Sequence, residues 1–328
     1  MANSIEVVLC SDGIALELLK KEYPSLKHEI LPSYNISYSF ESIVQNILWH
    51  IKDILLAVSQ EKKEIERLKE KHNAVAVISD NRYGCYFDEG YSIIMSHQLT
   101  IQSDPKWKGQ FASNILNKFI NKFSLCWIPD FEGKNSLGRE LSRNEKISNA
   151  KYIGCISRFE SLNLTKKYDL AMVLSGPEPA RSHLEKVLID QTKNLALSMV
   201  LVRGSDLARQ ENISDFSGDV FDLCIGTDLN KIVCQSSKVL CRSGYSSIMD
   251  LHKIGKNAIL IPTPGQTEQE YLARNLKNAG IIYSTDQKDF SIEEALIESD
   301  NYTGFTKIED KNLMEIAIQD LLKKMSFI

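Results

Sequence analysis

The sequence predicts an α/β protein with a parallel sheet in each half of the chain. Short apolar runs of strand length alternate with segments of helical periodicity along the whole chain. This alternation is typical of βαβ units, which build parallel sheets. The 328 residues are enough for two domains, and 43% of them are hydrophobic, so each half can bury a core of its own.

The first half reads as strands separated by helices. It ends in a polar, irregular stretch at residues 154–167, which we interpret as the hinge region. The predicted strands are residues 5–9, 28–31, 74–78, 92–95, 125–128 and 151–153, and the predicted helices are 14–22, 40 to about 71, and 111–123. We therefore place the first domain at residues 1–155.

A second series of strands and helices follows the hinge. The predicted strands are residues 170–174, 197–202, 220–225, 239–241 and 258–261, the predicted helices are 181–192, 228–235 and 245–254, and further elements lie at 281–284 and 291–299. These elements form a second domain, residues 156–310. Residues 311–328 contain a last helix, with apolar residues at helical spacing.

The composition excludes several classes of protein. A formal net charge of −4 gives no basis for general affinity for nucleic acid. The seven cysteines form no Cys-x-x-Cys pair and have no histidine at zinc spacing, so we expect reduced thiols in a cytoplasmic protein. No apolar run approaches transmembrane length, and the first four residues lack the basic region of a signal peptide.

Residues 239–271 are the most informative stretch, and they read as one βαβ unit. The loop Arg242-Ser243-Gly244 separates the first strand from the helix, and a polar loop at 262–269 follows the second strand. Ligands of open α/β sheets bind at this edge. A helix that begins after Gly244 presents free amides and a positive dipole end, which favour an anion such as phosphate.

These residues resemble the donor half of GT-B glycosyltransferases. The shared features are Arg-Ser-Gly, an acidic residue six positions after the glycine (Asp250), and the loop Pro-Thr-Pro-Gly-Gln-Thr-Glu-Gln-Glu. The chain resembles glycosyltransferase family 28, whose members form lipid II by adding N-acetylglucosamine. The likeness is strong over residues 175–280 and extends more weakly through 79–84 and 96–98. It implies two Rossmann-like domains facing across a cleft, with the last helix crossing back to the first domain.

The resemblance also implies a site for a UDP-sugar donor. The residues expected near the diphosphate are Ser175, Gly176, Arg181, Arg203, Arg242, Ser243 and Gly244. Asp250 is expected to bind the ribose hydroxyls, and residues 225–229 fall where the family packs the uracil base. The loop contributes Gly265, Gln266, Thr267, Glu268, Gln269 and Glu270, of which Gln269 and Glu270 would read the sugar hydroxyls. The lipid II enzymes have Gln-Gln there, so the identity of the sugar stays open.

The residues alone leave other interpretations of this donor site. The loop at 175–181 is equally an ordinary βα turn, Arg203 equally a surface arginine, and Arg242 equally a pin for its own turn. The chain contains no Asp-x-Asp triplet, the carboxylate pair that usually holds the ion of metal-dependent sugar transferases. Helix N-termini and arginines can neutralise the leaving group instead. We therefore predict a metal-independent, inverting reaction with no cofactor besides the UDP-sugar substrate.

Polar residues on the acceptor side follow two strands of the first half. Asp80, Asn81 and Arg82 follow one strand, and His97 and Gln98 follow the next. His97 is a candidate general base because imidazole titrates near neutral pH, and Asp80 is a second candidate if burial raises its pKa. Alternatively, Asp80 caps the next helix or turn, and His97 is a hydrogen-bonded loop residue.

One part of the family pattern is absent. In the family, a first strand and a Gly-rich loop containing Gly-His precede everything seen here, whereas this chain opens on what resembles the second strand, residues 5–9. We therefore expect the first sheet to lack a central strand, which leaves strand edges and apolar surface uncovered. Poor solubility, or a protein partner that covers this sheet, is the expected consequence.

Basic and aromatic residues are interleaved near the predicted helix at 111–123. They are Lys106, Trp107, Lys108, Phe111, Lys118, Phe119, Lys122 and Phe123. One interpretation is a peripheral contact with the inner face of the cytoplasmic membrane. The other, which we favour on the sequence alone, is a core helix with a solvated basic edge.

The sequence therefore predicts a hexosyltransferase. It would move a sugar, N-acetylglucosamine by the resemblance, from a UDP-sugar to a cell-envelope glycan or a lipid-linked acceptor. Two alternatives remain open: a non-catalytic or partner-dependent subunit that binds UDP-sugars, and a UDP-sugar epimerase on the same fold.

Overall fold

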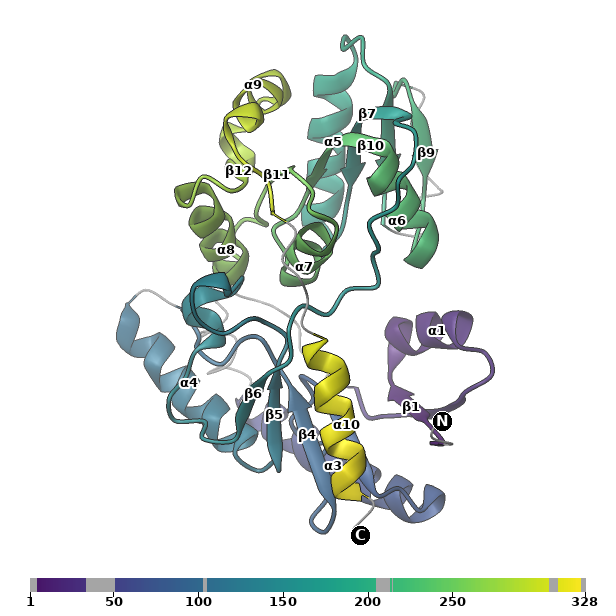
Figure 1. Cartoon of the computed structure of the whole chain (residues 1–328), viewed down its shortest axis with the longest axis vertical. Coiled ribbons are helices and arrows are strands. Elements are labelled where there is room, and N and C mark those ends of the chain that lie inside the picture. The colour runs from purple at the N-terminus through teal and green to yellow at the C-terminus, as the bar shows by residue number, and fades with distance from the viewer. Residues whose placement is uncertain are drawn as a thin grey trace.

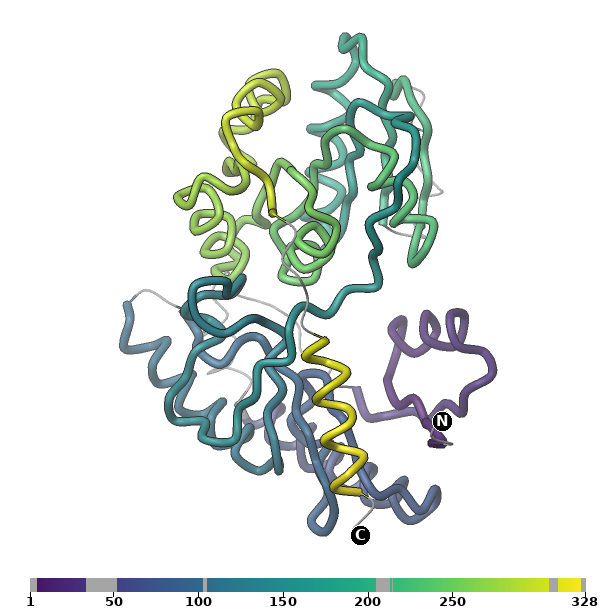
Figure 2. Tube along the Cα trace, viewed as in Figure 1, coloured from purple at the N-terminus to yellow at the C-terminus, as the bar shows by residue number. Residues whose placement is uncertain are grey.

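The structure, a computed structural model, describes residues 5–33, 51–102, 105–204, 213, 215–306 and 312–325. It contains two α/β domains arranged along the long axis of the molecule (Figure 1). An extended segment between β6 (Ala150–Tyr152) and β7 (Tyr168–Val173) connects them, as the trace in Figure 2 shows. Every strand pair in the described part of the chain is parallel. The predicted fold class is confirmed.

The second domain is built on a six-stranded sheet with the order β12-β11-β10-β7-β8-β9. Its other strands are β8 (Met199–Val202), β9 (Asp219–Phe221), β10 (Ser236–Cys241), β11 (Ala258–Leu260) and β12 (Tyr283–Ser284). Its helices are α5 (Ala180–Thr192), α6 (Gly226–Gln235), α7 (Tyr245–Ile254), α8 (Thr267–Asn278) and α9 (Ile292–Glu298). The strand predicted at 220–225 is shorter than expected, since β9 ends at Phe221.

Alternate residues of β10 pack on opposite faces of this sheet, as strand geometry requires. Val239 and Cys241 share a buried cluster with Ile248 of α7 and Leu272 of α8. Leu240 lies in a second cluster, which also contains apolar residues of α5 and α9. Helices α7 and α8 therefore cover one face of the sheet, and α5 and α9 cover the other.

The first domain has a four-stranded sheet with the order β3-β4-β5-β6. Its strands are β3 (Ala76–Asp80), β4 (Tyr91–Met95), β5 (Leu125–Ile128) and β6. Helix α4 (Lys106–Ile120) packs on one face, and α10 (Leu313–Met325) packs on the other through Ala317 and Leu321. The last helix of the chain thus completes the core of the first domain. Helix α4 begins at Lys106, before its predicted start at 111, and Pro105 is its N-cap residue.

A smaller unit stands to one side of this sheet (Figure 1). It consists of the parallel strands β1 (Val8–Ser11) and β2 (Lys27–Ile30) with helix α1 (Gly13–Glu22). Within the described residues, neither strand pairs with the four-stranded sheet. Helix α3 (Ile51–His72) packs against both parts, and the predicted helical residues 40–50 lie outside the described residues. Ile14 and Ile30 are exposed here, but the absence of a central strand stays a prediction.

A buried cluster of charges ties α5 to the end of β8. Glu185 of α5 accepts a hydrogen bond from Arg181 one turn earlier, and from Arg203 just after β8, with Nη2 at 2.5 Å from Oε1. Arg203 also lies 3.3 Å from Asp222. Arg181, Glu185 and Arg203 are all buried. A charge removed from water needs its partner, so each member of the cluster depends on the others.

We predict that Glu185→Ala lowers the free energy of unfolding by about 3–5 kcal/mol, because two buried guanidinium groups lose their carboxylate. Urea denaturation of the purified chain measures this loss. Asp190→Ala is the matched control: Asp190 lies on the same helix in an exposed pair with Lys193, so its loss should cost less than about 1 kcal/mol. Equal effects of the two substitutions would contradict the structural role of the cluster.

Candidate functional site

The candidate site lies where the strands of the second sheet end, on the side of the first domain. Helices α7 and α8 begin at this edge, and they lie at the end of the second domain that faces the first (Figure 1). The loops that follow β7, β10 and β11 meet here. This is the edge at which open parallel sheets bind their ligands.

Arg242 holds these loops together. Its Nη1 donates to the carbonyl oxygens of Ile261 (3.3 Å) and Pro262 (3.1 Å), and its Nη2 donates to the carbonyl oxygen of Ala180 (2.8 Å) and to Oε1 of Gln287 (2.9 Å). Burial lowers the pKa of Arg242 to about 10, so the guanidinium remains charged at neutral pH. Its Nε is buried and has no hydrogen-bond partner among the described residues.

A second buried polar atom at this edge, Oγ1 of Thr263, also has no partner in the described part of the protein. A β-carbon placed on Gly176 would lie 3.9 Å from this hydroxyl and close to no other atom. Gly176 has a φ of +100°, which other residues rarely adopt, so glycine keeps both the turn and the open space. Sequence reasoning missed Thr263 because nothing local indicates that its hydroxyl is buried and unpaired.

The N-terminus of α7 is open at the same place. Gly244 is the N-cap residue and has no side chain with which to cap the helix, and the first turn has no acidic residue. A β-carbon on Gly244 would meet nothing within 4 Å. Ser243 is buried, and its hydroxyl donates to the carbonyl oxygen of Gln269 at 2.9 Å. The first amides of α7 are thus positioned as an anion site requires.

Arg181 and Arg203 are placed differently from what a diphosphate contact needs. Both guanidinium groups are buried and bonded to Glu185, and Arg181 also donates to Glu178 and Ser182. A phosphate would have to compete with these carboxylates. The contact of the two arginines with the donor stays a prediction. In the structure, their bonds to Glu178 and Glu185 hold the loop that contains exposed Ser175.

The polar residues of the loop before α8 shape that loop themselves. Oε1 of Gln269 accepts from the amide of Thr263, and Oε1 of Glu270 accepts from the amide of Gly265, each at 2.9 Å. Nε2 of Gln269 donates to Gln266 at 2.6 Å. Thr267 is the first residue of α8. The two residues expected to read the sugar are therefore fixed in position before any ligand arrives.

Asp250 lies on α7 and faces the segment that connects the domains. The hydroxyl of Ser157 donates to its Oδ1 at 2.5 Å. Burial raises the pKa of the Asp250 carboxyl, while the bond from Ser157 and the charge of Arg158 act in the opposite direction. Asp250 therefore links α7 to the connecting segment, and its expected contact with the ribose hydroxyls stays a prediction.

The acceptor-side residues after β3 divide into two groups. Arg82 is structural: it bonds to Glu61 and to Asp12, each at 2.5 Å, and so ties the smaller unit to the four-stranded sheet. Asp80 ends β3, and Asn81 follows with a φ of +54°. The surrounding protein desolvates the Asp80 side chain and raises its pKa, whereas the nearby imidazole of His97 lowers it.

His97 reaches the second domain. Its Nε2 lies 2.9 Å from Oε1 of Glu268, and its ring stacks on that of Tyr245, with centroids 4.0 Å apart. The amide of Gln98 donates to Ser96 at 3.3 Å. Of the two candidate bases, His97 is therefore placed directly beside the beginning of α7.

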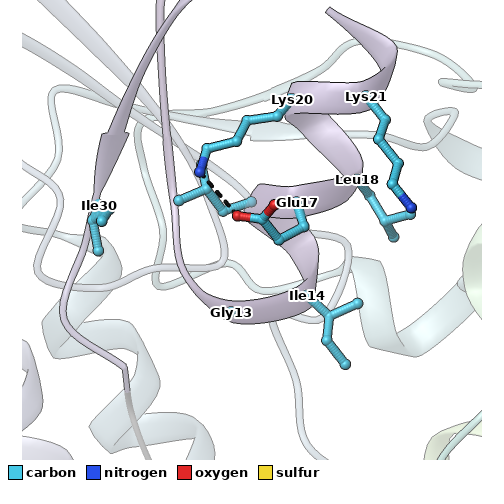
Figure 3. Close-up of a pocket in the computed structure, with 8 residues that line it drawn as sticks. Gly13, Ile14, Glu17, Leu18, Lys20, Lys21 and Ile30 are labelled. Carbon is cyan, nitrogen blue, oxygen red and sulfur yellow. Dashed lines mark hydrogen bonds and ion pairs between the residues drawn. The ribbon is translucent and has the colours of Figure 1, made fainter. Parts of the chain in front are cut away.

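A separate hollow of about 560 Å³ lies between α1 and β2. Figure 3 shows its lining, in which Ile14, Leu18 and Ile30 surround the ion pair of Glu17 and Lys20. None of the predicted site residues lines it. Its apolar walls belong to the smaller unit of the first domain.

The described residues contain neither a candidate metal centre nor a candidate membrane span. No group of three or more His, Cys, Asp or Glu side chains in this part of the chain could hold a metal ion. No helix in the same part is both long enough and apolar enough to cross a membrane.

Comparisons with known proteins support the fold described above. Residues 171–315 match the glycosyltransferase family 28 C-terminal domain, whereas no curated protein matches the chain. The fold is similar to that of the glycotransferase of kitacinnamycin, with 13% identity and a TM-score of 0.63 over 98% of this chain and 91% of that one.

Two other solved structures have similar folds. MurG of Acinetobacter baumannii is 12% identical, with a TM-score of 0.53 over 98% of this chain and 90% of that one. The spinosyn rhamnosyltransferase SpnG complexed with thymidine diphosphate is 13% identical, with a TM-score of 0.56 over 98% of this chain and 96% of that one. The chain has the GT-B fold of these glycosyltransferases, and its residues 171–315 match the glycosyltransferase family 28 C-terminal domain.

Proposed function

We propose that this protein is a metal-independent, inverting glycosyltransferase that uses a UDP-sugar. The observation that carries the proposal is a set of hydrogen-bond donors at one edge of the second sheet: the first turn of α7, which follows Gly244, together with Nε of Arg242 and Oγ1 of Thr263, which have no partner among the described residues. A diphosphate supplies the acceptor oxygens that these groups lack. The match of residues 171–315 and the thymidine diphosphate bound to SpnG support a nucleoside diphosphate as the ligand.

The proposed reaction is a single displacement at the anomeric carbon. An acceptor hydroxyl gives its proton to a base of the first domain, His97 or Asp80, and its oxygen forms the new bond to the sugar. The bond from the sugar to the diphosphate oxygen breaks at the same time, on the opposite face, so the configuration inverts. Amides of α7 and the buried guanidinium of Arg242 stabilise the charge that develops on the leaving UDP.

Asp250, Gln269 and Glu270 support the assignment of the donor. The Asp250 carboxylate can accept hydrogen bonds from both ribose hydroxyls. Gln269 and Glu270 are already fixed by the amides of their own loop, so a sugar meets a preformed surface. We propose N-acetylglucosamine as the sugar, because of the similarity to family 28.

The exposed face of α4 supports a lipid-linked acceptor. Trp107 is 64% exposed and Phe111, one turn later, is 50% exposed. Lys106, Lys118 and Lys122 are exposed on or just after the same helix. Aromatic side chains flanked by lysines suit an anionic membrane surface. We propose that the protein works in the cytoplasm, at the inner face of the membrane, on a cell-envelope glycan or its lipid-linked precursor.

The smaller unit of the first domain supports a protein partner. Its exposed Ile14 and Ile30 and the hollow between α1 and β2 form an apolar surface. Such a surface favours contact with another polypeptide. We propose that a protein partner covers this surface. The test is to measure the size of the purified chain alone and together with proteins co-purified from its source.

We expect UDP to bind the purified chain in the presence of EDTA, because the proposed site neutralises the diphosphate without a cation. Calorimetry should show affinity about tenfold weaker in Asp250→Ala, which loses the ribose contact and about 1.4 kcal/mol. Asp289→Ala, an exposed acidic residue of the same domain, should bind like the wild type. An absence of UDP binding, or a requirement for magnesium, would overturn the proposed function.

Thr263→Val gives a sharper test of the donor site. Valine keeps the shape of threonine but removes a hydroxyl that has no partner in the described protein. We expect an unchanged or raised Tm, since an unpaired buried group is removed, together with UDP affinity about fivefold weaker, which corresponds to one lost hydrogen bond of about 1 kcal/mol. A lower Tm with unchanged UDP affinity would show that the hydroxyl serves the fold and not the ligand.

For the membrane contact, we expect Trp107→Ser combined with Phe111→Ser to abolish sedimentation with vesicles that contain anionic lipid. The variant loses the apolar anchor while all the lysines remain. Ile297→Ser, which removes an exposed apolar side chain of α9, is the control and should sediment like the wild type. Equal sedimentation of wild type and double variant would contradict the contact.

A further inference from the structure

His97 and Glu268 form a polar contact between the two domains. His97 follows β4 of the first domain, and Glu268 lies in the first turn of α8 in the second. Their Nε2 and Oε1 atoms are 2.9 Å apart, and the side chains are only 19% and 21% exposed. A contact at this distance between two largely buried groups is a hydrogen bond with defined geometry.

The stacked ring of Tyr245 fixes the plane of the imidazole. The two rings are within 2° of parallel, and Tyr245 is itself buried, with its hydroxyl donating to the carbonyl oxygen of Pro129 at 2.9 Å. Tyr245 is the first residue of α7. The imidazole is therefore held beside the helix N-terminus at which the leaving diphosphate is proposed to bind.

Three ionisable groups face the imidazole from the elements around it. Asp80 comes from the end of β3, Glu268 from α8 and Tyr245 from α7. Tyr245 is neutral at physiological pH because burial raises its pKa. The two carboxyl groups are therefore the acidic neighbours of the ring, and the first residue of α7 stacks on it.

We propose that Glu268 is the positioning residue for His97 as general base, an inference that rests on the proposed transferase function. Glu268 accepts a hydrogen bond from Nε2–H. The proton therefore stays on Nε2, and Nδ1 is the basic nitrogen of the ring. The acceptor hydroxyl passes its proton to Nδ1 as its oxygen bonds to the anomeric carbon and the diphosphate leaves. The Glu268 carboxylate then stabilises the imidazolium, which returns its proton to solvent.

This arrangement makes the base dependent on domain closure. The imidazole comes from the first domain, while the carboxylate and the stacking ring come from the second. Movement of the domains apart would separate the imidazole from both of these groups. The acceptor would therefore be activated only while the domains are in contact around the donor.

The test uses the full chain, UDP-N-acetylglucosamine as donor and water as acceptor, with UDP release as the readout. Glu268→Gln keeps the size of the side chain and removes its charge. We expect kcat to fall at least tenfold, the acid limb of the pH–rate profile to move to lower pH, and the Kd for UDP and the Tm to stay unchanged. Glu268→Asp should restore the position of the acid limb, because it restores the carboxylate.

The matched control is Glu293→Gln, which removes an exposed carboxylate from the first turn of α9 and should leave rate and profile unchanged. A Glu268→Gln variant with the kcat and the pH–rate profile of the wild type would overturn the positioning role. An effect confined to the KM for the donor would also overturn it, because Glu268 would then be a donor contact. In both cases UDP binding by the wild type leaves the proposed function intact.

A second measurement does not depend on turnover. Nitrogen-15 spectra of the six histidines, with His97 identified through His97→Gln, report which ring nitrogen carries the proton. We expect neutral His97 to be protonated at Nε2 in the wild type and to become a mixture of both tautomers in Glu268→Ala. A wild-type ring protonated at Nδ1 would overturn the proposal.

Discussion

The contact of helix α7 with the first domain is the interaction on which the candidate site depends. Tyr245 bonds to the carbonyl oxygen of Pro129, and Asp250 bonds to Ser157 in the connecting segment. Apolar residues of the first domain, including Phe131 and Leu141, share one buried cluster with Ile248 and other residues of the second. Helix α7, whose N-terminus lies at the candidate site, therefore also packs directly against the first domain. Anything that moves α7 moves this N-terminus together with the Tyr245 ring that stacks on His97.

Local signals were sufficient to predict the framework around α7. The predicted helix at 245–254 coincides with α7 because Gly244 precedes it and Gly255, with a φ of +66°, ends it. Most other elements were predicted in the same way, from apolar runs of strand length followed by polar loops. The order of the strands in the sheets follows from βαβ connection rules only in outline, and the packing of α10 on the first domain depends on contacts between residues far apart in the sequence.

The roles of the arginines could not be predicted, because their partners are set by tertiary structure. Arg203 and Glu185 are 18 residues apart and meet only when α5 packs beside β8. A guanidinium at a sheet edge reads the same in the sequence whether it faces a phosphate or a buried carboxylate. The contact of Glu268 with His97 could not be predicted for the same reason. A carboxylate in the first turn of a helix is an ordinary helix feature, and only the packing of the two domains brings Glu268 to His97.

In the proposed donor site, two buried atoms that have no partner among the described residues, Nε of Arg242 and Oγ1 of Thr263, would set the chemical preference. A buried polar group without a partner costs about 1–3 kcal/mol, a cost that the protein carries while the site holds no ligand. The carbonyl oxygens of Ile261 and Pro262 hold the guanidinium of Arg242, and the side chain of Gln269 holds the backbone of Thr263. A ligand that supplies oxygen acceptors recovers the cost, whereas an apolar ligand of the same size does not. Under the proposed function, selectivity for an oxyanion would therefore arise from hydrogen bonds that the described part of the protein leaves unmade.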